Sequence, residues 1–496
     1  MYYNTIKQYF KWSVLLIAGI TSCSNFLNVT PKNVISMDDL ESIKQAMSGF
    51  LYNIVNDGSG SNSLPRSPFE SPVYGLVPYT DEWDLSKLAA NEFEDYEMQK
   101  ADWRDETTQY LWGNYYKPIG FMNLILHEAA IAEGDEAMRD YIMGEAYVMR
   151  AYCFFKLVQH FSPYKDNEWG IPVCLETYED FEEVTVARKT QKEVYTQILS
   201  DLHEAELCIG RTAPRTSFNL MYNSSVINRL YAEIYHFKAL SAASEADDWK
   251  NAVTYAEKET KERILESDPE ILKKIFTPGI YNSNLSSDPE CALRVRCTGG
   301  GMTFEYYFQN LEPNQIFYET YFPEEENDIR KDLYYKMVEI YDYNIWDYVT
   351  KLTIDKFSTY SDSWGYGYGY VHCGFRLAET FLIQAEALAM QDRIEEARII
   401  LDRFKSARYK STYTIPTEKE ALLQDIYRER RKEFVAEGDY GWLDMKRLGL
   451  KAERTIGGIT FKLEGEGDYR YAFPIPQSEI DNNKEIRQNP GWILNN

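Results

Sequence analysis

The residues that could carry out catalysis are few, and their spacing is wrong for it. Zinc peptidases hold their metal through two histidines of an HExxH motif on one helix. The chain offers HEAAI at 127–131 and HEAEL at 203–207, and each lacks the second histidine. The remaining histidines, 160, 236 and 372, are scattered. We therefore expect no metal site, with most histidines on helix surfaces or in the core.

Motifs for nucleophilic or phosphate chemistry are also missing. GSGSN at 58–62 does not have the G-x-S-x-G spacing, and GGG at 299–301 lacks the Lys-Ser/Thr of a P-loop. Glycosidases use two carboxylates whose separation is set in space, so a secreted hydrolase stays open as an alternative. Glu437 and Asp444 are the most tempting pair, but ion pairs with nearby arginines (Arg430, Arg431 or Arg447) are the preferred interpretation. No catalysis and no cofactor are expected.

One cysteine does predict chemistry, namely lipidation. Residues 1–11 carry two lysines and no acid, and residues 12–20 are apolar. A bilayer-spanning helix takes roughly 20 apolar residues, so this segment fits a secretory signal over residues 1–22 better. The sequence ITSC at its end resembles a bacterial lipobox, in which cleavage precedes the cysteine and Cys23 receives the lipid. Several acyl chains would hold the protein firmly on a membrane. An ordinary signal peptide with a chance cysteine is the alternative.

The composition excludes some classes of partner. The chain has 496 residues, a formal charge of −25 and a pI near 4.8, which argues against nucleic acid and against electrostatic docking to anionic lipid. Six cysteines beyond Cys23 are scattered without a CxxC, so neither a dense disulfide framework nor a zinc knuckle is expected. The 40 tyrosines, 24 phenylalanines and 10 tryptophans suit either core packing or stacking on sugar rings.

The elements that must position any site are mostly helices. Apolar residues at three- and four-residue steps predict helices over 138–161 and 190–208, the second with Thr190 as its N-cap. Two later stretches, 229–261 and 376–408, each have small residues on a first helix, a polar turn and alanines about a dozen residues on. This is a degenerate tetratricopeptide (TPR) pattern, although any two antiparallel helices would fit it.

Between the helices the chain predicts long loops, which in compact domains are commonly functional. Residues 58–85 are rich in Gly, Ser, Pro and aromatics, and residues 278–325 mix Pro, Gly, Asn and Ser with FEYYF. Residues 341–370 end in a run of alternating glycine and aromatic residues.

Several separate stretches resemble one family, the SusD/RagB outer-membrane lipoproteins. They are NFLNVTPKN after Cys23, GEAYVMRAYCFFKLVQHFSPYKDNEWGIPV (144–173), ARKTQKEVYTQILSDLHEA (187–205), RLAETFLIQAEALA (376–389), ERRKEFVAEGDYGWLDMKRLG (429–449) and YAFPIPQSEIDNNKEIRQNPGW (471–492). Their order over the whole chain makes the resemblance specific. EGDYGWLDM is one residue longer than the family's pattern and lacks its arginine, so local packing there is in doubt.

The resemblance implies a mainly α, SusD-like fold with TPR-like helix pairs and long ligand-binding loops. It implies an N-terminal domain over 23–235 and a C-terminal RagB/SusD domain over 236–496, with a loop-rich insertion at about 270–370. It also implies a non-catalytic, surface-exposed outer-membrane lipoprotein that captures glycan for a SusC-like TonB-dependent transporter. A non-glycan nutrient such as peptide is the alternative ligand.

Sugar rings stack on flat aromatic faces, and their hydroxyls need polar edges, so loop aromatics are the ligand-binding candidates. The candidates are Asp81 (with Glu82) and Trp83 in the first loop, Tyr306 and Tyr307 in the second, and Trp364, Tyr366, Tyr368 and Tyr370 in the third. An edge strand is the alternative for the alternating tyrosines. Trp346 is expected in the core and Trp442 in the scaffold. The resemblance favours Trp83 and the 304–318 loop.

Overall fold

The computed structural model describes most of the chain between Met37 and Trp492. The described residues are 37–56, 68–69, 80–84, 105–176, 186–211, 220–276, 289–297, 312–342, 345–354, 356, 370–456 and 459–492. Several candidates from the sequence lie outside them, namely Cys23, Tyr306, Tyr307, Trp364, Tyr366 and Tyr368.

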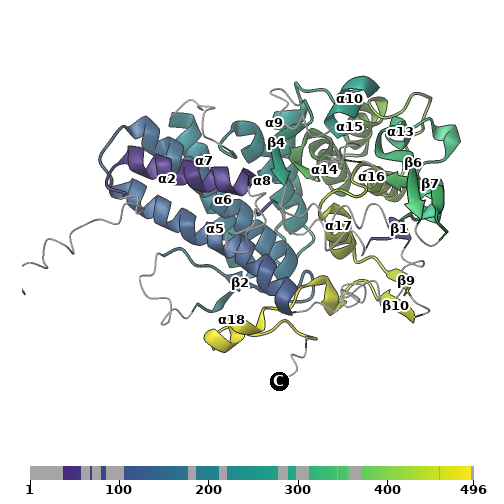
Figure 1. The fold of residues 1–496 in the computed structure, drawn as a ribbon. Helices are drawn as coiled ribbons and strands as arrows, with labels where there is room; N and C mark the ends of the chain where they lie inside the picture. Colours follow the sequence, from purple (N-terminus) through teal and green to yellow (C-terminus); the bar gives the residue numbers. More distant parts are fainter. Residues whose placement is uncertain are drawn as a thin grey trace, which may run out of the picture.

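Helices dominate the described structure, which confirms the mainly α class. The longer helices are α2 (Leu40–Asn56), α5 (Asp105–Ile131), α6 (Glu136–Phe161), α7 (Gln191–Arg211), α8 (Ser224–Lys238), α9 (Asp248–Thr260), α14 (Leu377–Met390), α15 (Ile394–Ser406), α16 (Lys419–Glu433) and α17 (Tyr440–Leu448). The shorter ones are α10 (Pro269–Phe276), α12 (Gln315–Tyr321), α13 (Ile329–Tyr334) and α18 (Gln477–Asn482), with 3₁₀ turns η3 (Glu324–Glu326) and η4 (Tyr469–Tyr471). In Figure 1, α2, α5, α6 and α7 form one lobe, and α14, α15 and α16 lie in the other.

The predicted helices form where the sequence places their starts and apolar faces. Helix α6 covers the predicted 138–161 and begins at Asp135, whose Oδ2 accepts a hydrogen bond from Met138 N at 3.1 Å. Helix α7 begins with a capping box. Thr190 Oγ1 accepts from Glu193 N at 3.2 Å, and Glu193 Oε2 accepts from Thr190 N at 2.8 Å. The predicted capping role of Thr190 is thus confirmed.

The two predicted helix–turn–helix units are present. Helices α8 and α9 pair across a short turn, as do α14 and α15, and α14 also packs against α9. The alanines that the sequence singled out lie at these contacts, since Ala252, Ala385 and Ala397 are fully buried. Small side chains let helix axes approach closely, which is what stacked TPR-like units require.

All strands of the described structure lie in two-stranded antiparallel ladders. The ladders are β1 (Trp83–Asp84) with β5 (Glu312–Pro313), β2 (Trp169–Pro172) with β3 (Arg188–Thr190), β4 (Cys291–Cys297) with β8 (Tyr370–Arg376), β6 (Tyr335–Asp342) with β7 (Asp347–Ile354), and β9 (Ala452–Ile456) with β10 (Ile459–Leu463). The segment 341–370, expected as a loop, therefore contains all of β7. The β4–β8 and β6–β7 ladders fall in or beside the predicted insertion.

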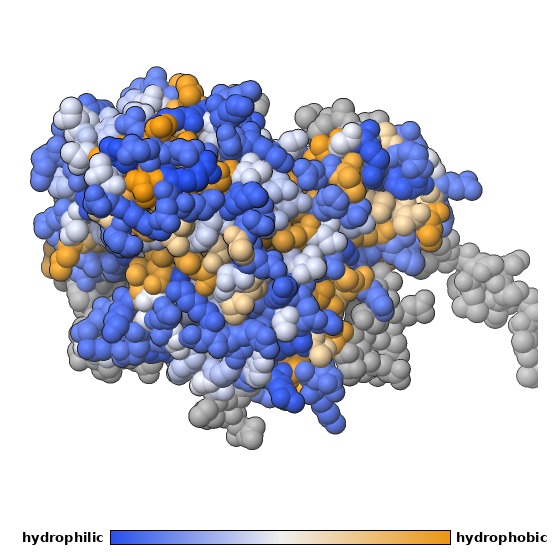
Figure 2. All heavy atoms as spheres, turned by 180° about the vertical axis from the view of Figure 1, so that it is seen from behind, coloured by the Kyte–Doolittle hydropathy of each residue, from blue (hydrophilic) through white to orange (hydrophobic). Residues whose placement is uncertain are grey.

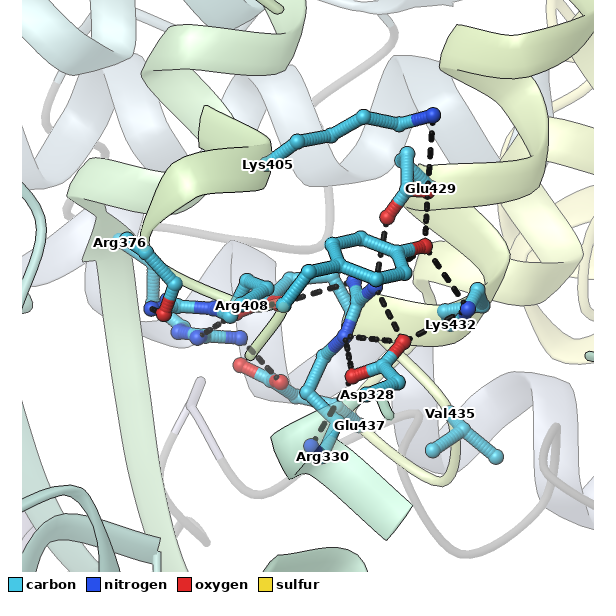
Figure 3. A network of polar contacts seen from close by, with 12 residues as sticks. Asp328, Arg330, Arg376, Lys405, Arg408, Glu429, Lys432, Val435 and Glu437 are labelled. Carbon is cyan, nitrogen blue, oxygen red and sulfur yellow. Dashed lines mark hydrogen bonds and ion pairs between the residues drawn. The ribbon is translucent and has the colours of Figure 1, made fainter. Parts of the chain in front are cut away.

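A set of charged side chains on α16 and the segments packed against it is almost fully buried, and its members pair with one another (Figure 3). We name it the buried charge network. Its members are Glu290, Asp328, Arg330, Lys356, Arg376, Arg408, Glu429, Lys432, Glu433 and Glu437. They come from α13, α16, the end of β8 and the segments between helices, so the network ties these elements together.

Glu433 lies at the centre of this network. Its Oε2 lies 3.0 Å from Arg408 Nε and 3.4 Å from Arg330 Nη1, and it also pairs with Arg376. Burial by itself would raise the pKa of Glu433, but the surrounding guanidinium groups hold that pKa well below its usual value. A buried charge of this kind is tolerated only because it is fully paired.

No helix in the described part of the chain is long and apolar enough to cross a membrane. Figure 2 shows one face of the molecule, on which hydrophilic residues dominate and apolar patches are small and scattered among them.

Candidate functional site

Segments far apart in the sequence meet at one end of the second lobe, where Figure 1 places β1 beside β6 and β7. Strand β1 pairs with β5 in the register Trp83 to Pro313 and Asp84 to Glu312. Asn314 N also donates to Glu82 O at 2.8 Å. Strand β7 packs on β5, where Lys351 Nζ lies 3.5 Å from Glu312 Oε1. The first loop, the insertion and the hairpin therefore form one surface.

The turn at 80–84 is also fixed to α16 and α17. Glu82 Oε2 accepts a hydrogen bond from Ala436 N at 2.8 Å. A Cβ at Gly441 would lie 2.6 Å from Thr80 Cγ2, so the close approach of the turn to α17 requires glycine. Burial raises the pKa of Glu82 to about 7, against the opposing effect of the Arg431 guanidinium. This carboxyl group is therefore only partly ionised at neutral pH.

Helix α12 contributes aromatic rings, and α16 contributes guanidinium groups that lie over them. The Phe317 and Tyr321 rings stack with centroids 4.3 Å apart. Arg431 lies 5.2 Å from the Phe317 ring and 5.3 Å from the Tyr321 ring, and Arg428 lies 5.4 Å from the Tyr321 ring. Arg428 Nη1 also donates to Thr320 O at 2.9 Å. The spacing i, i+3 puts both arginines on one face of α16.

Tyr321, Arg428 and Arg431 line a cavity of about 470 Å³. Its wall includes Glu82, Tyr321, Tyr427, Arg428, Arg430 and Arg431. A volume of several hundred Å³ with aromatic faces and a few polar groups is typical of small-molecule sites. The cavity can therefore hold a ring that stacks on an aromatic face and whose hydroxyls or charges meet the polar groups.

The outer half of the β6–β7 hairpin, whose strand β7 packs on β5, presents exposed rings. Trp346 is 78% exposed at the turn, where its φ of +55° reverses the chain, and Tyr348 is 66% exposed. Met337 and Ile345 are exposed with them. A two-stranded hairpin has little core of its own, so large exposed rings on it are available to a ligand.

The ligand-binding candidates from the sequence that the structure describes differ in their position and exposure. Asp81 is half-exposed and pairs with Arg431, at the edge of the cavity. Trp83 lies in β1 but is only 3% exposed, which corrects the expectation that its loop leaves the ring free to stack on a ligand. Tyr370 lies in β8, opposite Cys297, as the strand alternative has it for this residue. Tyr366 and Tyr368 lie outside the described residues.

Other residues of the site were not among the candidates. Trp346 was expected in the core and is exposed, because it lies at the turn of the β6–β7 hairpin. Arg431 was missed because it belongs to ERRKEF (429–434), which the resemblance marked as scaffold, and Arg428 directly precedes that stretch. Their i, i+3 spacing was the available signal.

Both carboxylates of the candidate pair for hydrolysis form ion pairs with basic side chains. Asp444 lies 2.9 Å from Arg430 Nε and 2.6 Å from Arg447 Nε, as the preferred interpretation had it. Glu437 pairs instead with Arg376 at 2.8 Å and Lys356 at 2.6 Å. Within the described residues no group of three or more His, Cys, Asp and Glu side chains is arranged to hold a metal ion.

Comparison with known proteins identifies the family. A model described as "SusD family" matches residues 212–492, and a model described as "Starch-binding associating with outer membrane" matches residues 25–232. The chain belongs to the SusD family, as its motifs predicted. A search of curated proteins found no match.

Solved structures share the fold. A SusD superfamily protein from Bacteroides thetaiotaomicron is 22% identical, with a TM-score of 0.71 over 91% of this chain and 100% of that chain. A SusD-like carbohydrate binding protein from Bacteroides vulgatus is 19% identical, with a TM-score of 0.67 over 90% of this chain and 97% of that chain.

Proposed function

We propose that this protein binds glycan at the cell surface and passes it, without chemical change, to a SusC-like TonB-dependent transporter of the outer membrane. The observation that carries the proposal is the cavity of about 470 Å³ with aromatic and polar groups in its wall. The exposed rings of the β6–β7 hairpin support it. Flat rings with adjacent polar groups suit sugars, and the SusD family membership supports a nutrient-binding role.

Affinity gel electrophoresis against a polysaccharide panel tests the glycan ligand. The protein should be retarded by at least one polysaccharide, and Trp346→Ala should reduce the retardation. Tyr52→Ala is the matched control, because Tyr52 is an equally exposed aromatic residue on α2, in the other lobe. Retardation by no polysaccharide, together with binding of peptides, would replace glycan by peptide. Cleavage of the glycan on prolonged incubation would restore the hydrolase alternative.

Two further experiments test location and partner. Cys23→Ala should release the protein from membranes while the ligand affinity of the purified body stays unchanged. A pull-down from solubilised outer membrane should recover a large transporter protein, and recovery of none would count against the partnership.

A further inference from the structure

The wall of the cavity is unusually rich in arginine for so acidic a protein. The chain carries a formal charge of −25, yet Arg428, Arg430 and Arg431 all line this one cavity. The guanidinium group is a planar fork of donors that matches a carboxylate with two parallel hydrogen bonds.

The acidic groups in the same wall do not cancel these charges. Asp444 is already shared between Arg430 at 2.9 Å and Arg447 at 2.6 Å. Glu82 is buried, hydrogen-bonded to Ala436 N, and only partly ionised at neutral pH because burial raises its pKa to about 7. The wall itself therefore carries more positive than negative charge. Glu326 and Asp81, which pair with Arg428 and Arg431, are not part of this wall and are partly exposed.

Hydrogen-bonding capacity is left over as well. Arg430 is 3% exposed, and its Nη1 is buried without a hydrogen-bond partner in the described part of the chain. A buried donor without a partner costs free energy unless a ligand or water accepts from it. This residue lines this cavity and also a second pocket beside Glu379 and Asp439, so an acceptor in either one would satisfy it.

The partner of Arg431 occupies the position that an incoming anion would take. Arg431 pairs with Asp81, whose side chain is 52% exposed on the surface turn at 80–84. Since such an exposed ion pair contributes little to stability, a ligand carboxylate can replace Asp81 on the Arg431 fork.

We infer that the cavity selects glycans that carry a carboxylate, namely uronic-acid-containing chains, with Arg431 and Arg430 as the groups that bind the carboxylate. The inference rests on the proposed glycan-binding function and adds the class of sugar. Asp81 is an internal competitor of the ligand, and Tyr321 lies in the same wall in contact with Arg428 and Arg431.

The test compares acidic polymers with their carboxyl-reduced forms. Polygalacturonate, alginate and hyaluronan, each beside its reduced counterpart, are used in affinity gels, and the best ligand is then titrated by calorimetry at low and high salt. We expect the acidic form to bind about tenfold more tightly than the reduced form, and salt to weaken it. Dextran and dextran sulfate form a second pair.

Variants test the carboxylate assignment separately from glycan binding in general. Arg431→Gln should lower affinity for the acidic polymer about tenfold, whereas Asp81→Asn should raise it, because the internal competitor is removed. Arg211→Gln is the control, since Arg211 forms a similar exposed ion pair with Asp140 at 2.7 Å in the other lobe. The opposite signs of the Arg431 and Asp81 effects cannot arise from misfolding alone.

Each outcome decides one question. Equal binding of acidic and reduced polymers, or an unchanged affinity in both Arg431→Gln and Asp81→Asn, would overturn the carboxylate assignment and leave glycan binding intact. Binding of dextran sulfate but of no uronate would also overturn it, in favour of sulfated chains. Binding of no glycan at all would overturn the proposed function and this inference with it.

Discussion

Helix α16 has two sets of charged residues that are used in opposite ways. Glu429, Lys432 and Glu433 face the buried charge network, where each charge is paired and almost none is exposed. Arg428 and Arg431 face the cavity, where their carboxylate partners, Glu326 and Asp81, are partly exposed. One helix thus carries two kinds of charge: buried charges that are fully paired within the protein, and charges at the cavity that a ligand can reach.

The two sets of charges therefore have different roles: the buried charge network positions α16, and the arginines at the cavity serve binding. Water cannot reach the network, so its charges depend on one another and hold α16 rigidly. The pairs at the cavity are solvated and contribute little to stability. Changes in the network should therefore be felt in unfolding, and changes at the cavity should be felt in affinity.

The largest effect is expected from Glu433→Gln. The substitution leaves the Arg330, Arg376 and Arg408 guanidinium groups without their shared carboxylate, and breaking a buried pair typically costs about 3–5 kcal/mol. The free energy of unfolding in urea measures the loss. Glu396→Gln is the control, because Glu396 forms an exposed pair with Arg393 on α15, and its loss should change stability little. Equal losses in the free energy of unfolding for the two variants would show that the buried pairs contribute no more to stability than an exposed pair.

Trp83→Ala should lower stability next most strongly, by about 3 kcal/mol, as expected for a buried tryptophan. Trp83→Phe should lower it less, because the phenyl ring fills part of the same space. Urea unfolding and ligand titration are measured together on both variants. If Trp83→Ala lost affinity while keeping its full stability, the ring would contact the ligand directly, and its assignment as a buried anchor would be wrong.

Trp346→Ala should change affinity alone. We expect binding to the best glycan to weaken roughly five- to tenfold, about 1 kcal/mol or slightly more, with an unchanged melting temperature, since the ring is exposed. Tyr52→Ala should change neither quantity. A drop in melting temperature on Trp346→Ala would show that the hairpin tip packs against the body of the protein.

The smallest effect concerns pH. The pKa of Glu82 is raised to about 7, so Glu82 gains negative charge beside Arg431 as the pH rises from 6 to 8. Affinity for an acidic glycan should fall a few-fold over this range, and Glu82→Gln should flatten the profile. If Glu82→Gln had the same pH profile of affinity as the unchanged protein, Glu82 would not be the group that controls it.

The stability of the protein should show the same titration. Because the folded pKa of Glu82 lies above its unfolded value of 4.5, its contribution to stability is fully present below pH 4.5. It is lost as the pH rises through about 7. Glu82→Gln should remove this part of the pH dependence of the unfolding free energy, which urea titrations at several pH values measure.

The sequence predicted the scaffold better than the site. Helices α6, α7, α8 and α14 follow from apolar spacing and capping residues, because these signals are local. The TPR-like pairing followed from alanines such as Ala385 and Ala397, which are small where helices meet.

The site was harder to predict because its neighbours are far apart in the chain. Asp81 meets Arg431 across 350 residues, and Trp83 meets Pro313 through a two-residue ladder. Nothing local distinguishes the exposed Trp346 from the buried Trp83, since both stand in polar, aromatic surroundings. Burial of a loop tryptophan is decided by which distant segment covers it.

The pair of Asp81 and Arg431 sets a minimum affinity that any ligand of the cavity must exceed. Asp81 is attached to the same chain, so its carboxylate is present at a fixed, high effective concentration beside Arg431. Chloride, phosphate or acetate in the surroundings must compete with it through a single contact and will lose. A polymer that also stacks a ring and reaches a second arginine can displace it, so the cavity ignores simple salts and responds only to ligands with several points of attachment.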